Sequence, residues 1–184
     1  MRGFAIANYN NELVYITGGS LDDHRGVADA VSAAALYSIA ANAWKDCRPL
    51  NRARYNHGSC ALDSRIYVFA GKSAFNDYEG SIETLRAGFD IVGGGFKACE
   101  EDWRLIMADQ PLLLRHSAAV CVLNDCEIVI LGGYYNGNKA TGGHHKGKLT
   151  DALIYNTEEG SLARVIESGP FAFDTSSQAY LVGR

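Results

Sequence analysis

The sequence predicts an all-β fold built from repeated antiparallel units. Three stretches support this prediction: NNELVYITGG (10–19), DSRIYVFAG (63–71) and NDCEIVILGG (124–133). Each begins with polar residues, continues through β-branched and aromatic residues, and ends at glycine. Val, Ile, Tyr and Phe favour strands, whereas Asn, Asp and Ser favour tight turns. Self-similarity at a regular spacing is typical of repeat proteins.

Each repeat is expected to open with a β-hairpin. A second strand-like run precedes each of the three stretches, at 4–9, 57–62 and 116–123. Only polar turn residues separate the two runs, which is the pattern of a hairpin.

A third strand is expected after the polar loop that follows each glycine. The candidate segments are AAALYS (33–38), SIETL (81–85) and DALIYN (151–156). All three are short and rich in apolar residues, which favours strands over helices.

A fourth strand completes each unit, and the second repeat contains an insertion. Trp44 follows Tyr37 by seven residues, whereas Trp103 follows Leu85 by eighteen. An insertion of about eleven residues is therefore expected in the second repeat. It includes GFDIVGGGFK, which we expect to form a loop because its glycines do not support a packed strand.

These residues resemble the kelch motif, in which a double glycine ends the second strand and an aromatic residue and a spaced tryptophan follow. The residues that carry the resemblance are Gly18, Gly19, Tyr37 and Trp44, then Arg54, His57, Gly71 and Trp103, then Arg115, His116, Gly132, Gly133 and Tyr155. The resemblance extends over about residues 4–168 and implies a β-propeller of four-stranded antiparallel blades. The first repeat lacks the Arg and His start, the second has Ala70 in place of one glycine, and the third has Leu162 in place of tryptophan.

The resemblance also implies how the chain is organised. We expect one domain, 1–184, with blades at about 4–50, 55–110 and 115–168, and the first strand of a further blade at about 176–183. Closed propellers have roughly four to eight blades, so three blades and one strand form an incomplete ring. We interpret the chain as a fragment of a larger propeller, and a homodimer that closes the propeller is the alternative.

The repeated aromatic and histidine residues are expected to be structural. Tyr37, Trp44, Trp103 and Tyr155 should pack between blades. His57 and His116 stand 59 residues apart, as do Trp44 and Trp103, so the two histidines are interpreted as equivalent positions of the repeat.

In kelch propellers the long loops between second and third strands gather at one end, and the resemblance implies that a protein or peptide partner binds there. Here these loops are 20–30, 72–80 and 134–149, of mainly acidic, mixed and basic composition. The candidate binding residues are Asp22, Asp23, His24, Arg25, Phe75, Asp77, Tyr78, Tyr134, Tyr135, Lys139, His144, His145, Lys146 and Lys148. Tyr and Arg are favoured at the centre of interfaces. The alternative is that these loops are only solubilising turns.

The glycine-rich segment TGGHHKGKLT (141–150) is not expected to bind a nucleotide or a metal ion. It has the spacing G-x-x-x-x-G-K, but a strand follows instead of a helix, and Leu149 occupies the place of the magnesium-binding Ser or Thr. His144 and His145 are neighbours and cannot share one face of a strand. The five cysteines include no C-x-x-C pair, so no zinc site is expected. No cofactor is predicted.

Composition excludes further classes of function. The net charge of -4 offers no basic excess for nucleic acid, and no apolar run approaches the ~20 residues of a membrane helix. No signal peptide is recognisable at the start, so a cytoplasmic location is expected. No catalytic set is recognisable, so we predict a binding module. The alternatives are a propeller enzyme, either an oxidase or a sugar-active enzyme, and a purely structural propeller segment.

Overall fold

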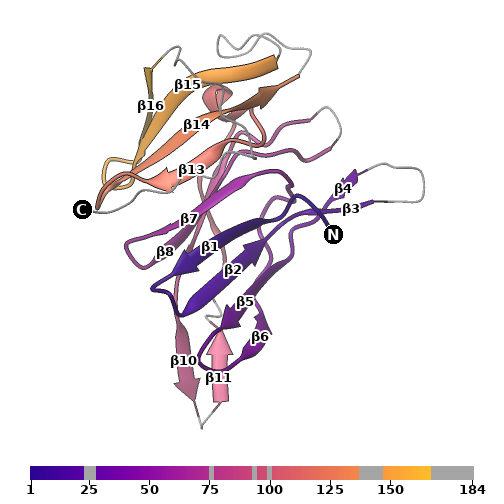
Figure 1. Ribbon diagram of the computed structural model, residues 1–184, viewed down its shortest axis with the longest axis vertical. Helices are drawn as coiled ribbons and strands as arrows, with labels where there is room; N and C mark the ends of the chain where they lie inside the picture. Colours follow the sequence, from indigo (N-terminus) through magenta and orange to yellow (C-terminus); the bar gives the residue numbers. More distant parts are fainter. Residues whose placement is uncertain (23–27, 75–76, 93–94, 99–100, 137–146, 167–184) are drawn as a thin grey trace.

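The computed structural model contains three four-stranded antiparallel sheets that follow one another along the chain (Figure 1). It describes residues 1–22, 28–74, 77–92, 95–98, 101–136 and 147–166. Strands that follow one another within a sheet are also hydrogen-bonded neighbours, which gives each sheet a simple up-and-down topology. The predicted all-β fold is therefore confirmed, although the described residues do not form a closed ring.

We call the three sheets blades. Blade 1 contains β1 (Ala5–Tyr9), β2 (Leu13–Thr17), β5 (Ala34–Ser38) and β6 (Ala43–Asp46). Blade 2 contains β7 (Gly58–Leu62), β8 (Arg65–Phe69), β9 (Ile82–Arg86) and β12 (Arg104–Met107). Blade 3 contains β13 (Ala119–Val122), β14 (Glu127–Tyr135), β15 (Gly147–Asn156) and β16 (Ser161–Ile166). The first strands β1, β7 and β13 lie next to one another in the middle of the molecule (Figure 1).

The prediction that the insertion in the second repeat forms a loop is wrong. The insertion forms a two-stranded hairpin of β10 (Phe89–Val92) and β11 (Gly95–Ala98), which extends from the lower end of the molecule (Figure 1). Phe89, Ile91 and Val92 favour a strand, and the glycines that follow favour the reversal of the chain.

The loops after the second strands also contain more structure than expected. The first contains a short hairpin of β3 (Ser20–Asp22) and β4 (Ala28–Ala30). In blade 3, β14 continues through the double glycine to Tyr135, and β15 already begins at Gly147, so both ends of the expected loop 134–149 are strand. A 3-10 helix, η1 (Pro111–Leu113), precedes blade 3. The expected strand at 176–183 lies outside the described residues. No described helix is long and apolar enough to cross a membrane.

The seven-residue spacing of the sequence corresponds to direct pairing across neighbouring strands. Tyr37 lies opposite Trp44, and Tyr155 lies opposite Leu162. In blade 2, Arg104 lies opposite Thr84, which places Trp103 at the level of Leu85. The hairpin of β10 and β11 therefore interrupts the repeat without shifting this register.

Each blade packs on the next through one of its two faces. We call the face that meets the next blade the forward face, and the face that meets the preceding blade the backward face. The first core joins the forward face of blade 1 to the backward face of blade 2; its buried members include Leu13, Tyr15, Leu36, Ile66, Val68, Leu85 and Trp103. The second joins the forward face of blade 2 to the backward face of blade 3; its buried members include Cys60, Tyr67, Phe69, Ile82, Ile128, Ile130, Leu153 and Tyr155. Successive side chains of a strand point to opposite faces of the sheet. In blade 2 both sets are largely apolar, so this blade packs on a neighbour through each of its faces.

The expectation that the repeated aromatic residues pack between blades is confirmed for Trp103 and Tyr155, which are buried. It is wrong for Trp44, whose side chain is exposed beside the half-buried Tyr37. Both lie on the backward face of blade 1, and no described blade packs on that face.

The second glycine of the repeat is required where the chain passes close to the start of the blade. Gly71 has a φ of 104°, which side chains rarely adopt. A Cβ atom there would lie 2.8 Å from the Cβ of His57 and 3.0 Å from the carbonyl oxygen of Tyr55. The equivalent Gly133 has a φ of 98°, and its Cβ would lie 2.7 Å from the carbonyl oxygen of His116.

We predict that Gly71→Ala destabilises the protein more than Gly160→Ala. Gly160 also has a positive φ, but its Cβ would meet nothing within 4 Å. Gly160→Ala should therefore cost only the backbone strain of about 1–2 kcal/mol, whereas Gly71→Ala should add crowding of about 1–3 kcal/mol. Urea unfolding followed by circular dichroism measures both, and equal losses would contradict the crowding.

Candidate partner-binding surface

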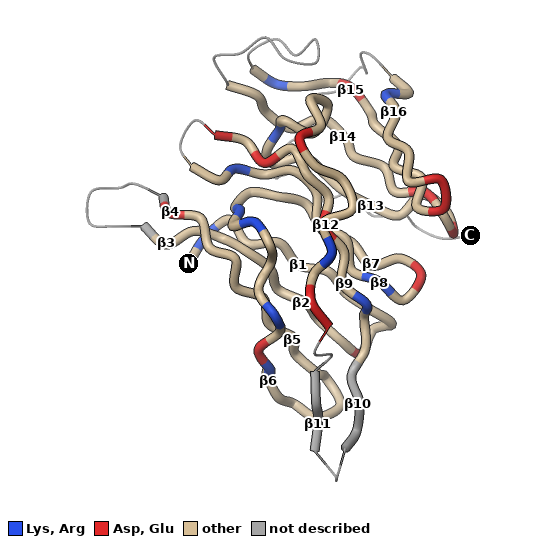
Figure 2. Tube along the Cα trace, turned by 180° about the vertical axis from the view of Figure 1, so that it is seen from behind, with Lys and Arg blue, Asp and Glu red and all other residues tan. Residues whose placement is uncertain are grey.

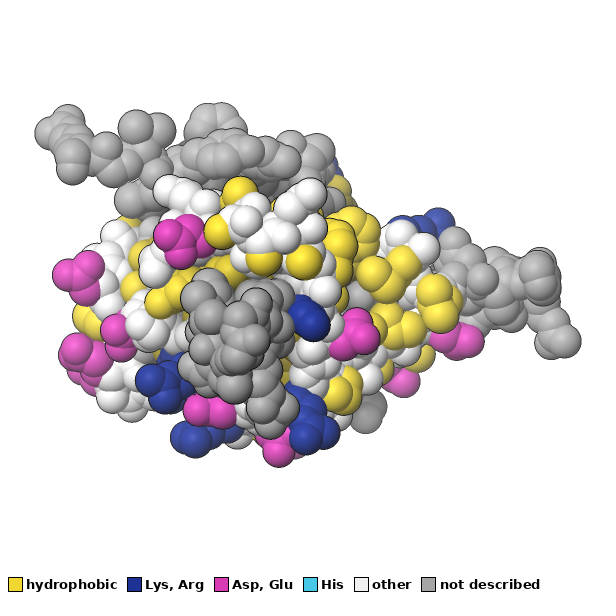
Figure 3. Space-filling model, turned by 90° about the horizontal axis from the view of Figure 1, so that it is seen from below, with side chains coloured by type: hydrophobic (Ala, Val, Ile, Leu, Met, Phe, Trp, Pro, Cys, Tyr) yellow, Lys and Arg dark blue, Asp and Glu magenta, His cyan; other side chains and the backbone are white. Residues whose placement is uncertain are grey.

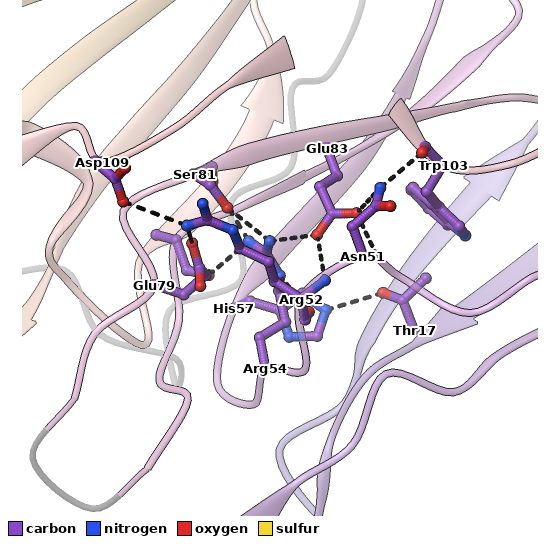
Figure 4. Close-up of polar contacts among 11 residues, drawn as sticks. Thr17, Asn51, Arg52, Arg54, His57, Glu79, Ser81, Glu83, Trp103 and Asp109 are labelled. Carbon is purple, nitrogen blue, oxygen red and sulfur yellow. Dashed lines mark hydrogen bonds and ion pairs between the residues drawn. The ribbon is translucent and has the colours of Figure 1, made fainter. Parts of the chain in front are cut away.

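A buried arginine lies at the start of blade 2. Arg54 donates hydrogen bonds to the carbonyl oxygen of Ala70 at 3.1 Å, to Oγ of Ser81 at 2.7 Å and to Oε1 of Glu83 at 2.7 Å (Figure 4). Both charged side chains are fully buried. Burial lowers the pKa of Arg54, while Glu83 opposes that shift. The arrangement joins the start of the blade to its second and third strands.

A second buried arginine lies at the same place in blade 3. Arg115 donates to the carbonyl oxygen of Gly132 at 2.8 Å and to both carboxylate oxygens of Asp151, at 2.7 and 2.9 Å. Two parallel bonds to one carboxylate form the strongest geometry of an ion pair. Asp151 also lies 3.0 Å from Arg164 of β16.

The backbone of each arginine is bonded to the preceding blade. The carbonyl oxygen of Arg54 accepts a hydrogen bond of 2.8 Å from the amide of Gly19, and that of Arg115 accepts one of 2.9 Å from the amide of Gly71. One residue therefore connects two blades: its carbonyl group is bonded to one, and its guanidinium group to the other.

A polar network fixes the segment that leads from blade 1 to blade 2 (Figure 4). Glu83 accepts hydrogen bonds from the backbone amides of Asn51 and Arg52, at 2.7 and 3.1 Å, in addition to its bond with Arg54. Arg52 forms an ion pair of 2.9 Å with Glu79, which is almost buried. These bonds satisfy the buried carboxylate of Glu83, whose burial would otherwise be costly.

His57 belongs to the same interior and connects blade 2 to blade 1. Its Nε2 shares a hydrogen bond of 2.9 Å with Oγ1 of Thr17 (Figure 4). Burial, together with the nearby charge of Arg54, lowers the pKa of His57 to about 3. The side chain is therefore neutral at physiological pH and structural.

The equivalence expected between His57 and His116 is wrong. A pair of backbone hydrogen bonds recurs just before each first strand, where Tyr55 pairs with Lys72 in blade 2 and His116 pairs with Tyr134 in blade 3. His116 is thus equivalent to Tyr55. It is half-buried at the end of the molecule where the double glycines lie, and burial followed by the charge of Lys72 lowers its pKa to about 4.

Aromatic rings and lysines from blades 2 and 3 meet at this end. We call this group the tyrosine–lysine surface; it consists of Tyr55, Lys72, Tyr78, His116, Tyr134, Tyr135 and Lys148. The ring centroid of Tyr78 lies 5.9 Å from that of His116 and 5.1 Å from that of Tyr135. The rings of His116 and Tyr134 stack at 5.7 Å. The rings therefore form one continuous group across the boundary between the two blades.

The two lysines lie over the rings of this surface. The ammonium nitrogen of Lys72 is 5.6 Å from the ring centre of Tyr78 and 6.0 Å from that of Tyr55. That of Lys148 is 5.8 Å from the ring centre of Tyr134. Such separations allow cation–π attraction. Burial also raises the pKa of Tyr78, whose hydroxyl oxygen accepts a hydrogen bond of 2.7 Å from the amide of Asn136.

The structure brings together only some of the binding residues expected from the sequence. Tyr78, Tyr134 and Lys148 belong to the tyrosine–lysine surface and are at least partly exposed, and Asp77 is exposed beside Tyr78. Tyr135 packs on Tyr78 but is only 3% exposed, so the expectation that it is available to a partner is wrong. Asp22 lies in β3 of the first loop. The others lie outside the described residues: Asp23, His24, Arg25, Phe75, Lys139, His144, His145 and Lys146.

Sequence reasoning missed three members of this surface: Tyr55, Lys72 and His116. A signal for them was present, because Tyr55 and His116 each follow a repeated arginine and Lys72 follows a repeated glycine. Positively and negatively charged residues are interspersed along the described chain rather than separated (Figure 2). Among the described residues no three His, Cys, Asp or Glu side chains form a group that could hold a metal ion.

Comparison with known proteins shows a partial likeness to one kelch-like protein. No family model matches the chain. A stretch of 72 residues, 38% of the chain, is 36% identical to kelch-like protein 30 of Homo sapiens and covers 12% of that protein. The chain thus matches a small part of this relative. The likeness and the three four-stranded antiparallel sheets are both consistent with kelch-type repeats.

We predict that Arg54→Met lowers the free energy of unfolding by about 3–5 kcal/mol, because it leaves the buried carboxylate of Glu83 without its cation. Arg48→Met is the matched control. Arg48 lies 3.8 Å from Asp102, and both side chains are mostly exposed. Its loss should cost about 0–1 kcal/mol. Similar losses in the two variants, measured by urea unfolding, would refute a structural role for the buried pair.

We predict that His57 makes the protein less stable in acid. Its pKa in the folded protein, about 3, is lower than the ordinary value of 6.5. Below pH 6.5 the unfolded chain therefore binds a proton that the folded chain does not. The contribution of His57 to the free energy of unfolding is complete above pH 6.5, and it falls by about 1.4 kcal/mol per pH unit as the pH decreases toward 3. In His57→Asn this part of the slope should disappear; parallel curves for the two proteins would contradict the assignment.

Proposed function

We propose that the chain is a kelch-type protein-interaction module that binds a peptide segment of a partner at the tyrosine–lysine surface. One observation carries the proposal: rings and lysines from two neighbouring blades converge beside the C-terminal ends of β8 and β14. The likeness to a kelch-like protein supports an interaction role. Because the site combines residues of two blades, it forms only when the two blades are folded and packed together.

The chemistry of this surface favours a segment with acidic and apolar side chains. Tyr78, His116 and Tyr134 are half-buried, so each ring offers a face or edge while its position stays fixed by its neighbours. Rigid aromatic side chains give contact area at low cost in conformational entropy. Lys72 and Lys148 provide positive charge beside the rings, which attracts a carboxylate and selects against basic segments.

We propose binding rather than catalysis. The rings of Tyr78 and Tyr134 both pack against the ring of His116, which accounts for their positions by packing. The competing hypothesis is a copper-dependent propeller oxidase, which would require tyrosine, histidine and cysteine ligands that converge on one ion. Copper titration with an oxidation assay tests the two: the binding module should show no oxidation at stoichiometric copper, and turnover would overturn it.

We predict that Lys148→Glu weakens the binding of acidic peptides. Random phage-displayed peptides selected on the unmodified protein should be enriched in Asp and Glu next to aromatic or aliphatic residues. The selected peptides should bind Lys148→Glu at least about tenfold more weakly, which is about 1.4 kcal/mol, as measured by calorimetry.

The matched control is Lys45→Glu, which makes the same charge change at an exposed lysine of β6, in the outer strand of blade 1. Its affinity for the selected peptides should equal that of the unmodified protein. Equal weakening by both variants would mean that only net charge matters. Peptides with no acidic preference, or no selected peptides at all, would overturn the proposal.

A further inference from the structure

The backward face of blade 1 is largely apolar, and no described blade packs on it. Paired strands place Ile6, Ile16 and Ala35 in one row of this face, which ends at Asp46, and Val14, Tyr37 and Trp44 in the next, which begins at Asn8. Ile6 is 54% exposed and Trp44 is 55% exposed. Seen from below, hydrophobic side chains reach the molecular surface at several places (Figure 3). An exposed row of this kind marks an interaction site or a site of aggregation.

The same positions are buried wherever a blade precedes. Trp44 corresponds in register to Trp103 of blade 2, which is 3% exposed, and Tyr37 corresponds to Leu85, at 1%. Tyr155 of blade 3 occupies the position of Tyr37 and is also 3% exposed. In both cases the covering surface is the forward face of another blade. The repeat therefore indicates what fits on blade 1: a forward face.

The chain itself carries a forward face that no described blade covers. In blade 3, strand pairing places Cys121, Val129 and Ile154 in one row, and Ala119, Leu131 and Ala152 in the next. All are partly exposed except Ala152, which is buried. The equivalent residues of blade 2 are Cys60, Tyr67 and Phe69, which are buried against blade 3. Blade 3 thus presents a forward face, which is the kind of surface that covers the backward faces of blades 2 and 3 and is missing from the backward face of blade 1.

We propose that two copies of this chain assemble head to tail, with the forward face of blade 3 in each copy packed on the backward face of blade 1 in the other. Three blades from each of two copies make six, which lies within the range of closed propellers. The two new interfaces repeat the packing already present between blades 1 and 2 and between blades 2 and 3. Closure buries both apolar faces and leaves none for further growth.

This assembly goes beyond the proposed peptide binding and does not depend on it. The tyrosine–lysine surface is formed by blades 2 and 3 of one copy, whereas the new interfaces involve the outer faces of blades 1 and 3. Failure of either proposal would therefore leave the other unaffected.

Sedimentation equilibrium of the 184-residue chain tests the assembly. The expected mass is twice 19.9 kDa. Ile6→Lys on the backward face and Val129→Lys on the forward face should each weaken the dimer on the order of 100-fold or more, because a lysine would be buried without a partner. In a dimer of identical chains, either substitution affects both interfaces. Ile39→Lys is the matched control, because Ile39 is 52% exposed in a turn outside both faces and its variant should remain dimeric.

Mixing the two variants provides a second test that does not depend on one substitution alone. Ile6→Lys keeps an intact forward face, and Val129→Lys keeps an intact backward face. The mixture should form a one-to-one complex through a single interface, while each variant alone stays monomeric. Circular dichroism checks that both remain folded.

Three outcomes would overturn the head-to-tail dimer. The first is a folded monomer at all concentrations. The second is a dimer that one substitution weakens and the other does not, which would indicate that identical faces meet. The third is an open-ended polymer, which would show that the faces pair without closing. If Val129→Lys fails to fold, Leu131→Lys replaces it on the same face.

Discussion

A buried arginine at the start of a blade connects that blade to the one before it, and the arrangement of the blades depends on this connection. The carbonyl group of Arg115 accepts a hydrogen bond from Gly71 of blade 2, while its guanidinium group bonds to Gly132 and Asp151 of blade 3. Because water is excluded, the carboxylate requires its cation, and because the carboxylate is fixed in β15, the arginine has one position. Arg54 makes the same double connection between blades 1 and 2.

The position of the candidate binding surface follows from these arginines. Tyr55 comes directly after Arg54 and His116 comes directly after Arg115, so each ring is placed by the backbone of a residue that is itself fixed. The second glycine of the repeat passes close to the same segment, and Lys72 and Tyr134 follow it. The rings thus meet at the boundary of two blades because the structural repeat brings its ends together there. The same repeat gives every blade a forward and a backward face, and the two unmatched faces are a direct consequence.

Much of the fold was predictable because its signals are local. Runs of β-branched and aromatic residues between polar turns located the strands, and Trp44, seven residues after Tyr37, located the fourth strand, which pairs with the third. The hairpin in the insertion was missed because its glycines were interpreted as excluding a strand, whereas strand pairing continues as far as Val92 and Gly95. The histidine equivalence was wrong because a spacing of 59 residues was assumed to be constant, although the equivalent residues Tyr55 and His116 stand 61 apart. Which rings meet depends on contacts between blades, and no single stretch of sequence contains that information.

Hydrogen exchange at the amides of Gly19 and Gly71, followed by nuclear magnetic resonance, tests the central role of the arginines most directly. These amides donate to the carbonyl groups of Arg54 and Arg115, so they report on the connection between blades. If the arginines hold the blades together, both amides exchange only on global unfolding, with the same free energy as the amide of Ile66 in the buried strand β8. Exchange of Gly19 and Gly71 by local opening, at a clearly lower free energy than Ile66, would show that the blades are joined by other means and would contradict the account.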